Sequence, residues 1–357
     1  MVIEDLLREL VEKKGSDLHI PNGLPPVMRI DGQLIKKEME PLTSEQVENL
    51  LFPMLSNDQR RHLEQDWELD FSYGIAGLCR FRANFYKDKG AYAAAFRTIS
   101  SKAPQLEELG MPEIVKKVAE KPRGLVLVTG PTGSGKSTTL AAMIDYINRT
   151  RAEHILTIED PVEFVHTSKQ SIIHQRELGA DTRSFTNALR AALREDPDII
   201  LVGEMRDHET ISLALTAAET GHLVFGTLHT SSASQTIDRI IDVFPEGQQQ
   251  QIRVQLANSL VAVFSQTLLK KLQPDGTLKG RVMAQEIMLV TPAIANLIRE
   301  AKVAQIYSTI QTSQGIGMQT LEMCLANLYK SQLVTLEDAM SKTSRPEELK
   351  RQIQLSG

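Results

Sequence analysis

Ten residues, GPTGSGKSTT at 130–139, constrain the fold of this chain more than any other segment. They follow the apolar run 125–128 and open a helix-like segment at 140–147. Two glycines that bracket four residues and precede Lys-Ser are typical of a phosphate-binding loop between a strand and a helix. A glycine-rich turn that merely connects the two elements is the alternative, and the flanking pattern disfavours it. The segment therefore predicts a site for a nucleoside triphosphate.

Several groups of this loop are expected to face the phosphates. Backbone N–H groups and the helix N-terminus provide partial positive charge, and Lys136 provides a full one. Ser137 is placed to hold Mg²⁺. The residues expected to bind ATP are Gly130, Pro131, Thr132, Gly133, Ser134, Gly135, Lys136, Ser137 and Thr138.

Length and composition are those of an ordinary globular protein. The 357 residues suggest two or three domains, with 41% hydrophobic and 24% charged residues. The formal net charge of -5 gives no overall basic field, so a nucleic-acid partner is not expected. Cys79 and Cys324 are too few and too far apart for a disulfide framework or a cysteine zinc site, which fits a reducing compartment.

The N-terminus resembles neither a secretory signal nor a membrane span. Residues 1–15 read as an amphipathic helix with interspersed acids, and no apolar run in the chain reaches about 18 residues. We therefore expect a cytoplasmic protein that reaches a membrane only through a partner.

Residues 1–100 have a pattern of their own. Short strand candidates alternate with helical stretches, which predicts a small α+β domain with an antiparallel sheet. The strands are expected at 16–20, 27–30, 69–73, 79–85 and 92–97, and the helices at 1–14, 44–55 and 57–65. Residues 101–122, punctuated by three prolines, are interpreted as a linker with one helix.

From residue 123 the pattern changes to strand-length apolar runs that alternate with helices. The runs lie at 125–129, 154–158, 198–203 and 222–228. This alternation predicts a mostly parallel sheet covered on both faces, within an α/β core at 123–291. Apolar residues at helical spacing across 252–268 predict one long amphipathic helix. Residues 292–357 are expected to form a helical tail.

Carboxylates follow two of these strands. Glu159, Asp160 and Glu163 come directly after the run 154–158, and Glu204 comes directly after the run 198–203. Ligands of open parallel sheets sit at that end of the strands, and ATP hydrolysis needs acids that hold Mg²⁺ and a group that positions water. A solvated acidic loop is the alternative for the first cluster. Glu204 departs from the common pattern, in which this acid is Asp.

Two histidines bracket the fourth strand, His222 before it and His229 after it. A regular strand of seven residues separates their backbones by about 23 Å, so both cannot touch one phosphate. His229 is expected to contact the γ-phosphate. His222 is expected to be structural or at an interface, with a direct nucleotide role as the lesser alternative.

The N-terminal domain contributes Arg80, Arg82 and Arg97. Arg80 and Arg82 flank Phe81 and therefore share one face of a strand. An arginine delivered to the γ-phosphate contributes about 10³–10⁵ in rate. An exposed strand face that carries solvated cations explains the same residues equally well.

Four segments together resemble the motifs of the secretion-type ATPases. GPTGSGKSTT (130–139), HILTIEDPVEF (154–164), ALREDPDIILVGEMRDHET (192–210) and AAETGHLVFGTLHTSSA (217–233) resemble the Walker A motif, Asp box, Walker B motif and His box. Within that superfamily the chain most closely resembles the type IV pilus retraction ATPases. The similarity extends to KGSDLHI near the start and GMQTLEMCLANL in the tail.

The resemblance implies an α/β fold with a RecA-like ATPase domain and a smaller N-terminal α+β domain of the PAS type. It implies a homohexameric ring whose ATP hydrolysis powers pilus retraction, the depolymerisation of pilin and twitching motility. The ring would act through an inner-membrane platform protein of the PilC type and lie at the cytoplasmic face of that membrane.

The resemblance also implies residue roles. Lys136 and Ser137 would contact phosphate and Mg²⁺, Glu163 would be the general base, Glu204 the Walker B acid and Mg²⁺ ligand, and His229 a γ-phosphate contact. The N-domain arginines Arg82 and Arg97 would complete the site in the same or a neighbouring subunit. Apart from the resemblance, the acidic cluster after residues 154–158 makes Glu159 a further candidate Mg²⁺ ligand.

Two sequence differences separate the chain from related ATPases. The pilus-assembly and type II secretion ATPases carry a four-cysteine zinc motif and a longer N-terminal extension, which are lacking here, and this favours retraction. The tail motif AIRNLIRE of the retraction family reads AIANLIRE at 293–300, with Ala295 where arginine is expected. The missing cation removes a candidate contact to a partner or another domain.

Two other functions use the same core. A DNA- or protein-translocating ring ATPase of the conjugation type is the first, and the acidic net charge disfavours a nucleic-acid substrate. The second is an accessory retraction ring that needs a partner motor. Ala295 keeps this second function open, although the intact Lys136, Glu163 and Glu204 argue against it.

Overall fold

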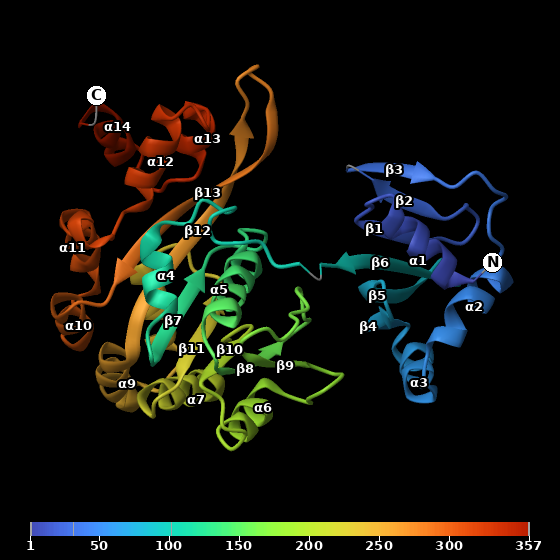
Figure 1. Ribbon diagram of the computed structural model, residues 1–357, viewed down its shortest axis with the longest axis horizontal. Helices are drawn as coiled ribbons and strands as arrows, with labels where there is room; N and C mark the ends of the chain where they lie inside the picture. Colours follow the sequence, from blue (N-terminus) through green and yellow to red (C-terminus); the bar gives the residue numbers. More distant parts are fainter. Residues whose placement is uncertain (1, 31, 101, 356–357) are drawn as a thin grey trace. The chain divides into compact units, whose positions relative to one another are not determined.

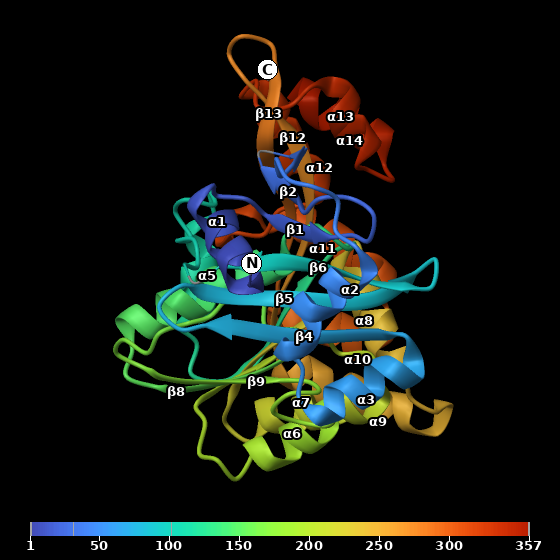
Figure 2. The same cartoon turned by 90° about the vertical axis from the view of Figure 1, so that its right-hand side faces the viewer.

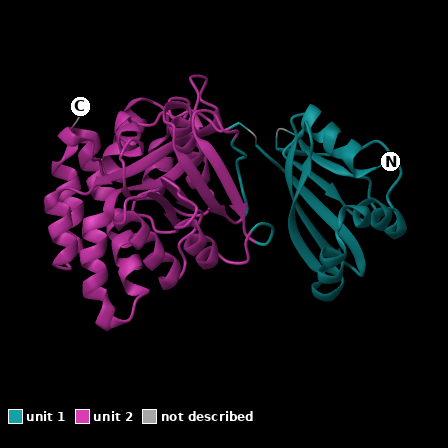
Figure 3. Cartoon of the chain, turned by 60° about the horizontal axis from the view of Figure 1, so that its bottom comes forward, with its two compact units in different colours: residues 1–102, 161–166, 179–181 teal, residues 103–160, 167–178, 182–357 magenta. Residues whose placement is uncertain are grey.

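The computed structural model describes residues 2–30, 32–100 and 102–355. Its chain divides into two compact units, coloured separately in Figure 3. Unit 1 comprises Met1–Lys102, Pro161–His166 and Gly179–Asp181. Unit 2 comprises Ala103–Asp160, Thr167–Leu178 and Thr182–Gly357. Two short segments from the middle of the sequence thus belong to the N-terminal unit.

Unit 1 is an antiparallel sheet covered by helices, as the sequence predicts. The strand order is β3-β2-β1-β6-β5-β4, and β4, β5 and β6 lie side by side in both Figure 1 and Figure 2. The elements are α1 (Ile3–Glu12), β1 (Asp17–Ile20), β2 (Val27–Ile30), β3 (Gln33–Lys36), α2 (Ser44–Leu51), the 3₁₀ helix η1 (Phe52–Met54), α3 (Asn57–Asp66), β4 (Glu68–Ile75), β5 (Cys79–Asp88) and β6 (Ala91–Ile99).

Alternation along β5 separates the two faces of this sheet. Phe81 and Phe85 are fully buried, and Phe85 packs edge-on against Phe96 of β6 at 5.8 Å between ring centroids. Arg82 lies between the two buried phenylalanines and is exposed, because successive side chains of a strand point to opposite faces. The core therefore lies on one face of the sheet, and the arginines lie on the other.

Unit 2 contains a seven-stranded sheet in the order β13-β12-β7-β11-β10-β8-β9. All neighbouring pairs are parallel except β12 and β13. The elements up to the sheet's last strand are α4 (Glu113–Ala119), β7 (Gly124–Thr129), α5 (Lys136–Thr150), β8 (His154–Glu159), β9 (Ile172–Glu177), α6 (Phe185–Ala192), β10 (Ile199–Val202), α7 (His208–Glu219), β11 (Leu223–Leu228), α8 (Ala233–Asp242), α9 (Glu246–Ser259), β12 (Leu260–Leu272) and β13 (Leu278–Leu289).

Helices cover both faces of this sheet, as expected for parallel strands. The helices α4 and α5 pack on one face, where Ile144 of α5 and Val126 of β7 belong to the same apolar cluster. The helices α6 to α9 pack on the other face, where Leu215 and Leu256 join Leu127 in a second cluster. The mixed α/β fold with a mostly parallel sheet and a separate N-terminal α+β unit is thereby confirmed.

The tail is helical, as predicted. It contains α10 (Pro292–Arg299), η2 (Val303–Gln305), α11 (Ile306–Thr312), η3 (Gln314–Ile316), α12 (Leu321–Lys330), α13 (Leu336–Ser341) and α14 (Pro346–Leu355). Figures 1 and 2 both place α12, α13 and α14 beside the β12–β13 hairpin. Leu269 of β12 and Ala284 of β13 pack there against Leu325 of α12.

The prediction of one helix across 252–268 was wrong. The helix α9 ends at Ser259, and Leu260 begins the strand β12. This strand pairs with β7 from Leu260 to Ser265 and with β13 from Ala262 to Leu272. A strand whose two faces are both buried is apolar nearly throughout, so its sequence resembles that of a buried helix.

Among the helices of the described residues, none is long and apolar enough to span a membrane.

Candidate nucleotide site

The phosphate-loop segment lies between β7 and α5, as predicted. Gly130 directly follows β7 with φ of 146°, and Gly135 caps α5 with φ of 89°, both values that favour glycine. A Cβ on Gly130 would lie 2.3 Å from the carbonyl oxygen of Gln266. Backbone conformation and a close neighbour therefore both restrict position 130 to glycine.

Two polar groups in this loop fit a bound phosphate. Lys136 Nζ donates to the carbonyl oxygens of Gly130 at 2.9 Å and Pro131 at 3.2 Å. Ser134 Oγ is buried and has no hydrogen-bond partner among the described residues. Such an orphaned donor calls for an explanation, and a phosphate oxygen provides one. Ser137, in the first turn of α5, is half-buried and adjacent to this cradle.

The carboxyl ends of four parallel strands meet at the same edge of the sheet. Thr129 at the end of β7 pairs with Leu228 of β11, and Val202 at the end of β10 pairs with Gly226 of β11 and Ile158 of β8. The residues that immediately follow these strands therefore lie near the phosphate loop. This register brings Glu159, Glu204 and His229 to the expected edge.

Glu204 contacts two basic side chains at this edge. Arg206 Nη2 donates to Glu204 Oε2 at 2.5 Å, and His229 Nε2 lies 3.1 Å from Glu204 Oε1. Burial opposes ionisation of the carboxyl, but the hydrogen bond and charge of Arg206, with His229 and Lys136 nearby, outweigh it and lower the pKa of Glu204. Glu204 is therefore a carboxylate at neutral pH, as a ligand of Mg²⁺ must be.

Glu159 ends β8 and is held from two sides. Its Oε1 accepts hydrogen bonds from Thr157 Oγ1 at 2.6 Å and Gln175 Nε2 at 3.2 Å. A Cβ on Gly203 would lie 3.2 Å from Glu159 Cα, so the end of β8 lies close to the residue after β10. The two acidic strand ends are thus neighbours, and carboxylate oxygens are ligands that Mg²⁺ prefers.

Glu163 belongs to unit 1 rather than to the unit that contains the phosphate loop. Phe164 forms a β-bridge with Ser100, and the backbone N–H of Val165 donates to the Ser100 carbonyl oxygen at 3.1 Å. Glu163 is exposed. The segment 161–166 therefore lies beside the residue that directly follows β6, the strand that carries Arg97.

Arg82 and Arg97 are directly opposite each other on β5 and β6. Arg97 Nε donates to Asp17 Oδ1 at 2.8 Å, and Arg82 Nε lies 3.7 Å from Asp70 Oδ1. Both arginine side chains are about half exposed or more, at 49% and 71% for Arg82 and Arg97. Like charges directly opposite on a strand pair are destabilising, so this arrangement is unusual for a purely structural face.

His222 occupies a structural position. Its Nδ1 lies 2.9 Å from the carbonyl oxygen of Ala217, in the last turn of α7. It precedes β11 and so lies at the edge of the sheet opposite to His229. The expectation that His222 is structural agrees with these contacts.

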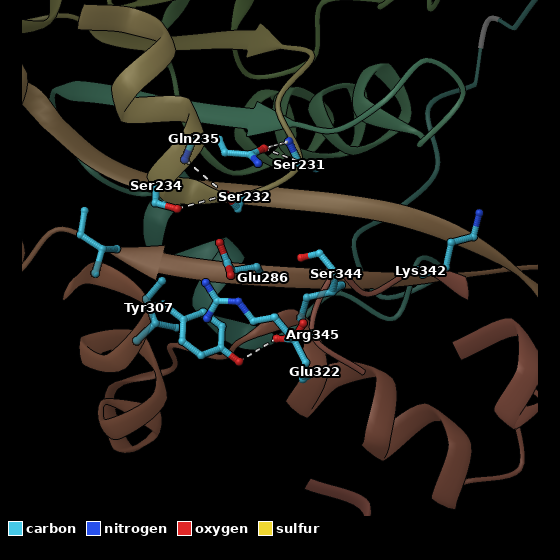
Figure 4. A pocket seen from close by; sticks show the side chains of 13 residues that line it. Ser231, Ser232, Ser234, Gln235, Glu286, Tyr307, Glu322, Lys342, Ser344 and Arg345 are labelled. Carbon is cyan, nitrogen blue, oxygen red and sulfur yellow. Dashed lines mark hydrogen bonds between the residues drawn. The ribbon is translucent and has the colours of Figure 1, made fainter. Parts of the chain in front are cut away.

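A small pocket lies beside the loop that follows His229. Figure 4 shows it between Ser231–Gln235 and residues of the tail, with a cavity volume of about 190 Å³. Glu286 of β13 lines it and accepts a hydrogen bond from the backbone N–H of Ala233 at 2.7 Å.

Burial, together with the charge of Glu322, raises the pKa of Glu286 to about 7. Arg345 stacks on the ring of Tyr307 at 3.5 Å in the same pocket.

Sequence reasoning missed two residues next to the phosphate loop and the strand ends. Arg206 lies two residues after Glu204, and a cation so close to a Walker B acid was the available signal. Gln266 of β12 forms hydrogen bonds with Ser134 of the loop and Thr139 of the helix that follows it. It was missed because its segment was read as a helix.

Comparisons with known proteins agree with this geometry. The family described as "Type II/IV secretion system protein" matches residues 1–328. The chain is 56% identical over 347 residues to the type IV pilus retraction ATPase PilT of Pseudomonas aeruginosa, covering 97% of this chain and 99% of that protein. It is 53% identical over 324 residues to a twitching motility protein of Neisseria gonorrhoeae, covering 91% of this chain and 86% of that protein.

A solved structure agrees as well. The crystal structure of the pilus retraction motor PilT with bound ADP matches with a TM-score of 0.91 and 49% identity, covering 98% of this chain and 99% of that one. The chain therefore belongs to the family of type II/IV secretion system proteins.

Proposed function

We propose that this chain is an ATP-hydrolysing motor that retracts type IV pili and so powers twitching motility. The observation that carries the proposal is the pairing of Glu204 with His229 at the strand ends next to the phosphate loop, in a chain similar over nearly its whole length to a retraction ATPase. The similar crystal structure holds ADP, which supports a nucleotide at the loop of this chain.

The residues divide the chemical work between them. Lys136 and the N–H groups of residues 130–138 bind the phosphates, and His229 contacts the γ-phosphate. Ser137, Glu204 and Glu159 hold Mg²⁺, which neutralises phosphate charge when bound. Glu163 positions and deprotonates the attacking water. Arg82 and Arg97 stabilise the charge that develops on the transferred phosphoryl group.

The motor is a homohexameric ring that acts on pilin indirectly. Its proposed domains are 1–100, the ATPase core at 123–291 and the tail at 292–357. The predicted linker at 101–122 contains α4, which packs on the core sheet. The ring lies at the cytoplasmic face of the inner membrane, where it contacts a platform protein of the PilC type. The names of the relatives, a retraction ATPase and a twitching motility protein, support the action on pili. The ring, the platform protein and the membrane face are what the resemblance implies.

Complementation tests the function directly. The chain, its Lys136→Ala variant and its Ala295→Arg variant are each expressed in a strain that lacks its retraction ATPase. Restored twitching with the wild-type chain but not with Lys136→Ala supports the proposal. Ala295 is buried in α10. Motility of Ala295→Arg therefore reports on a cation at this position only when the variant is as thermally stable as the wild type.

An accessory retraction ring is the second candidate, and Ala295 is the observation that favours it. An accessory ring restores motility only when a partner motor is present, whereas a motor restores it alone. Stimulation of ATP turnover by DNA would instead indicate a translocating ATPase of the conjugation type.

A further inference from the structure

The buried side-chain amide of Gln266 packs against the phosphate loop. Gln266 of β12 donates from Nε2 to the Ser134 carbonyl oxygen at 2.8 Å and accepts at Oε1 from Thr139 Oγ1 at 2.9 Å. Gln266 is 3% exposed, and Thr139 is fully buried. One side chain therefore holds both the loop itself and the first turn of the helix that follows it.

The backbone of the same residue meets the start of the loop. A Cβ on Gly130 would lie 2.3 Å from the Gln266 carbonyl oxygen, and one on Gly135 would lie 3.4 Å from Gln266 Nε2. Gln266 thus contacts the loop at its beginning, its middle and its end. An apolar side chain here would leave the buried hydroxyl of Thr139 without its acceptor.

The contact continues away from the loop through two further glutamines. Gln285 of β13 is the cross-strand partner of Gln266, and its Nε2 donates to Gln266 Oε1 at 3.4 Å. Gln319 Nε2 donates to the Gln285 carbonyl oxygen at 2.9 Å. Cys324 Sγ, in α12, accepts from the backbone N–H of Gln285 at 3.5 Å. We call Gln266, Gln285 and Gln319 the glutamine row.

We propose that Gln266 is a positioning residue of the phosphate loop, and that the glutamine row couples nucleotide binding at the loop to the helical tail at α12. This inference rests on the proposed ATPase function. Phosphate contacts pull on Ser134 and on the N-terminus of α5, both of which Gln266 holds. Movement of Gln266 shifts Gln285, and Gln285 contacts the segment that begins α12.

The first experiment tests positioning. Gln266→Leu removes all three side-chain hydrogen bonds of Gln266, to Ser134, Thr139 and Gln285, at nearly constant volume. Small displacements of phosphate-binding groups lower kcat by roughly 10- to 100-fold. Ser265→Ala is the matched control, because it removes a buried hydrogen bond of the same strand, to Thr129, without touching the loop. We expect kcat of Gln266→Leu to fall by that factor while its melting temperature without nucleotide matches that of Ser265→Ala.

Gln266→Glu keeps the acceptor for Thr139 and loses the donor to Ser134, so it tests the loop contact separately if the leucine variant does not fold. Wild-type kcat and KM for ATP in either folded variant would overturn the positioning role.

The second experiment tests the coupling without reference to turnover. Cys79→Ser leaves Cys324 as the single thiol of the chain. We expect saturating MgADP to slow alkylation of Cys324 by roughly five-fold or more, the lower range of measured coupling between sites. In Gln285→Leu, which keeps the Gln266 contacts with Ser134 and Thr139, we expect MgADP to bind but the alkylation rate to become independent of it.

The outcomes separate the two proposals. A chain that neither binds MgADP nor hydrolyses ATP contradicts the proposed function. A chain that hydrolyses ATP, but whose Cys324 alkylation ignores nucleotide or responds equally in Gln285→Leu, contradicts the glutamine row.

Discussion

The Glu204 carboxylate sits among three basic side chains, and its role depends on that balance. Arg206 occupies one oxygen and His229 the other, while Lys136 contributes at longer range. The carboxylate is therefore kept ionised, and each of its oxygens has a basic partner.

Replacing Glu204 by Gln tests its role as an acid. We expect Glu204→Gln to bind MgADP but to turn ATP over roughly 100-fold more slowly, because the neutral amide stabilises the metal poorly. ATP hydrolysis is measured across a range of Mg²⁺ concentrations. The control is Glu246→Gln, an exposed acid in the first turn of α9. Unchanged turnover with unchanged Mg²⁺ dependence would remove Glu204 from the site.

Replacing Lys136 by Ala removes the full positive charge of the loop. We expect nucleotide binding and phosphate release to be lost, because no other side chain of the loop carries a charge. Binding of a fluorescent ADP analogue and release of phosphate are measured side by side. Undiminished phosphate release by Lys136→Ala would contradict the site assignment.

The buried Glu286 predicts a pH-dependent stability. Its pKa is raised from 4.5 to about 7, chiefly by burial, with the charges of Glu322 and Arg345 nearby acting in opposite directions. Between those pH values the unfolded chain releases a proton that the folded chain keeps, so folding stability falls as pH rises. The loss is complete above about pH 7 and is at most roughly 3 kcal/mol.

Glu286→Gln keeps the acceptor for Ala233 and cannot ionise. We expect its melting temperature to exceed that of the wild type at pH 8 and to match it at pH 5. Glu12→Gln, an exposed residue at the end of α1, is the control. An equal difference at both pH values would show that Glu286 does not titrate in this range.

At the scale of elements, the strand pair β5–β6 places two arginines in positions that destabilise the sheet. Arg82 and Arg97 repel each other across the pair, and each is only partly neutralised by an aspartate. The sequence reading left solvated cations and catalytic arginines open, and the directly opposed pairing favours the second.

Arg82→Ala separates these two readings. We expect ATP turnover to fall by roughly 10³-fold, with a much smaller change in ADP affinity, because the arginine acts on transition-state charge. The melting temperature is expected to stay level or rise, because the repulsion is relieved. Kinetics and thermal unfolding are measured on the same preparations. Wild-type turnover would return Arg82 to a solvated face.

The burial pattern of a strand determines whether its sequence predicts it. The strands β7, β8, β10 and β11 were predicted because short apolar runs alternate with helices. The strand β12 was read as helix because it is buried on both faces, and β9 was missed because His174, Gln175 and Arg176 interrupt its apolar pattern. Propensity alone does not separate such strands from helices or loops.

The candidate site follows the same rule. Glu204 and His229 directly follow predicted strands, so their neighbourhood could be predicted. Gln266 lies opposite the loop only because β12 pairs with β7, and Phe164 pairs with Ser100 across 64 positions of sequence. Contacts between distant segments leave no local pattern from which to predict them.

At the scale of the whole molecule, the proposed ring predicts that ATP turnover depends on protein concentration if a neighbouring subunit contributes to each site. We expect ATP turnover per subunit to rise with concentration and reach a plateau, and the light-scattering mass to reach a multiple of the 39.8 kDa chain over the same range. Lys136→Ala is expected to assemble without turning over. Turnover per subunit that is constant down to nanomolar concentration, with a monomeric mass, would contradict a ring.

The segments 161–166 and 179–181 make the N-terminal unit discontinuous in the sequence. The chain passes between the units at residues 102–103, 160–161, 166–167, 178–179 and 181–182. A fragment that ends at residue 102 would therefore lack part of this unit, including Glu163 and the bridge from Phe164 to Ser100.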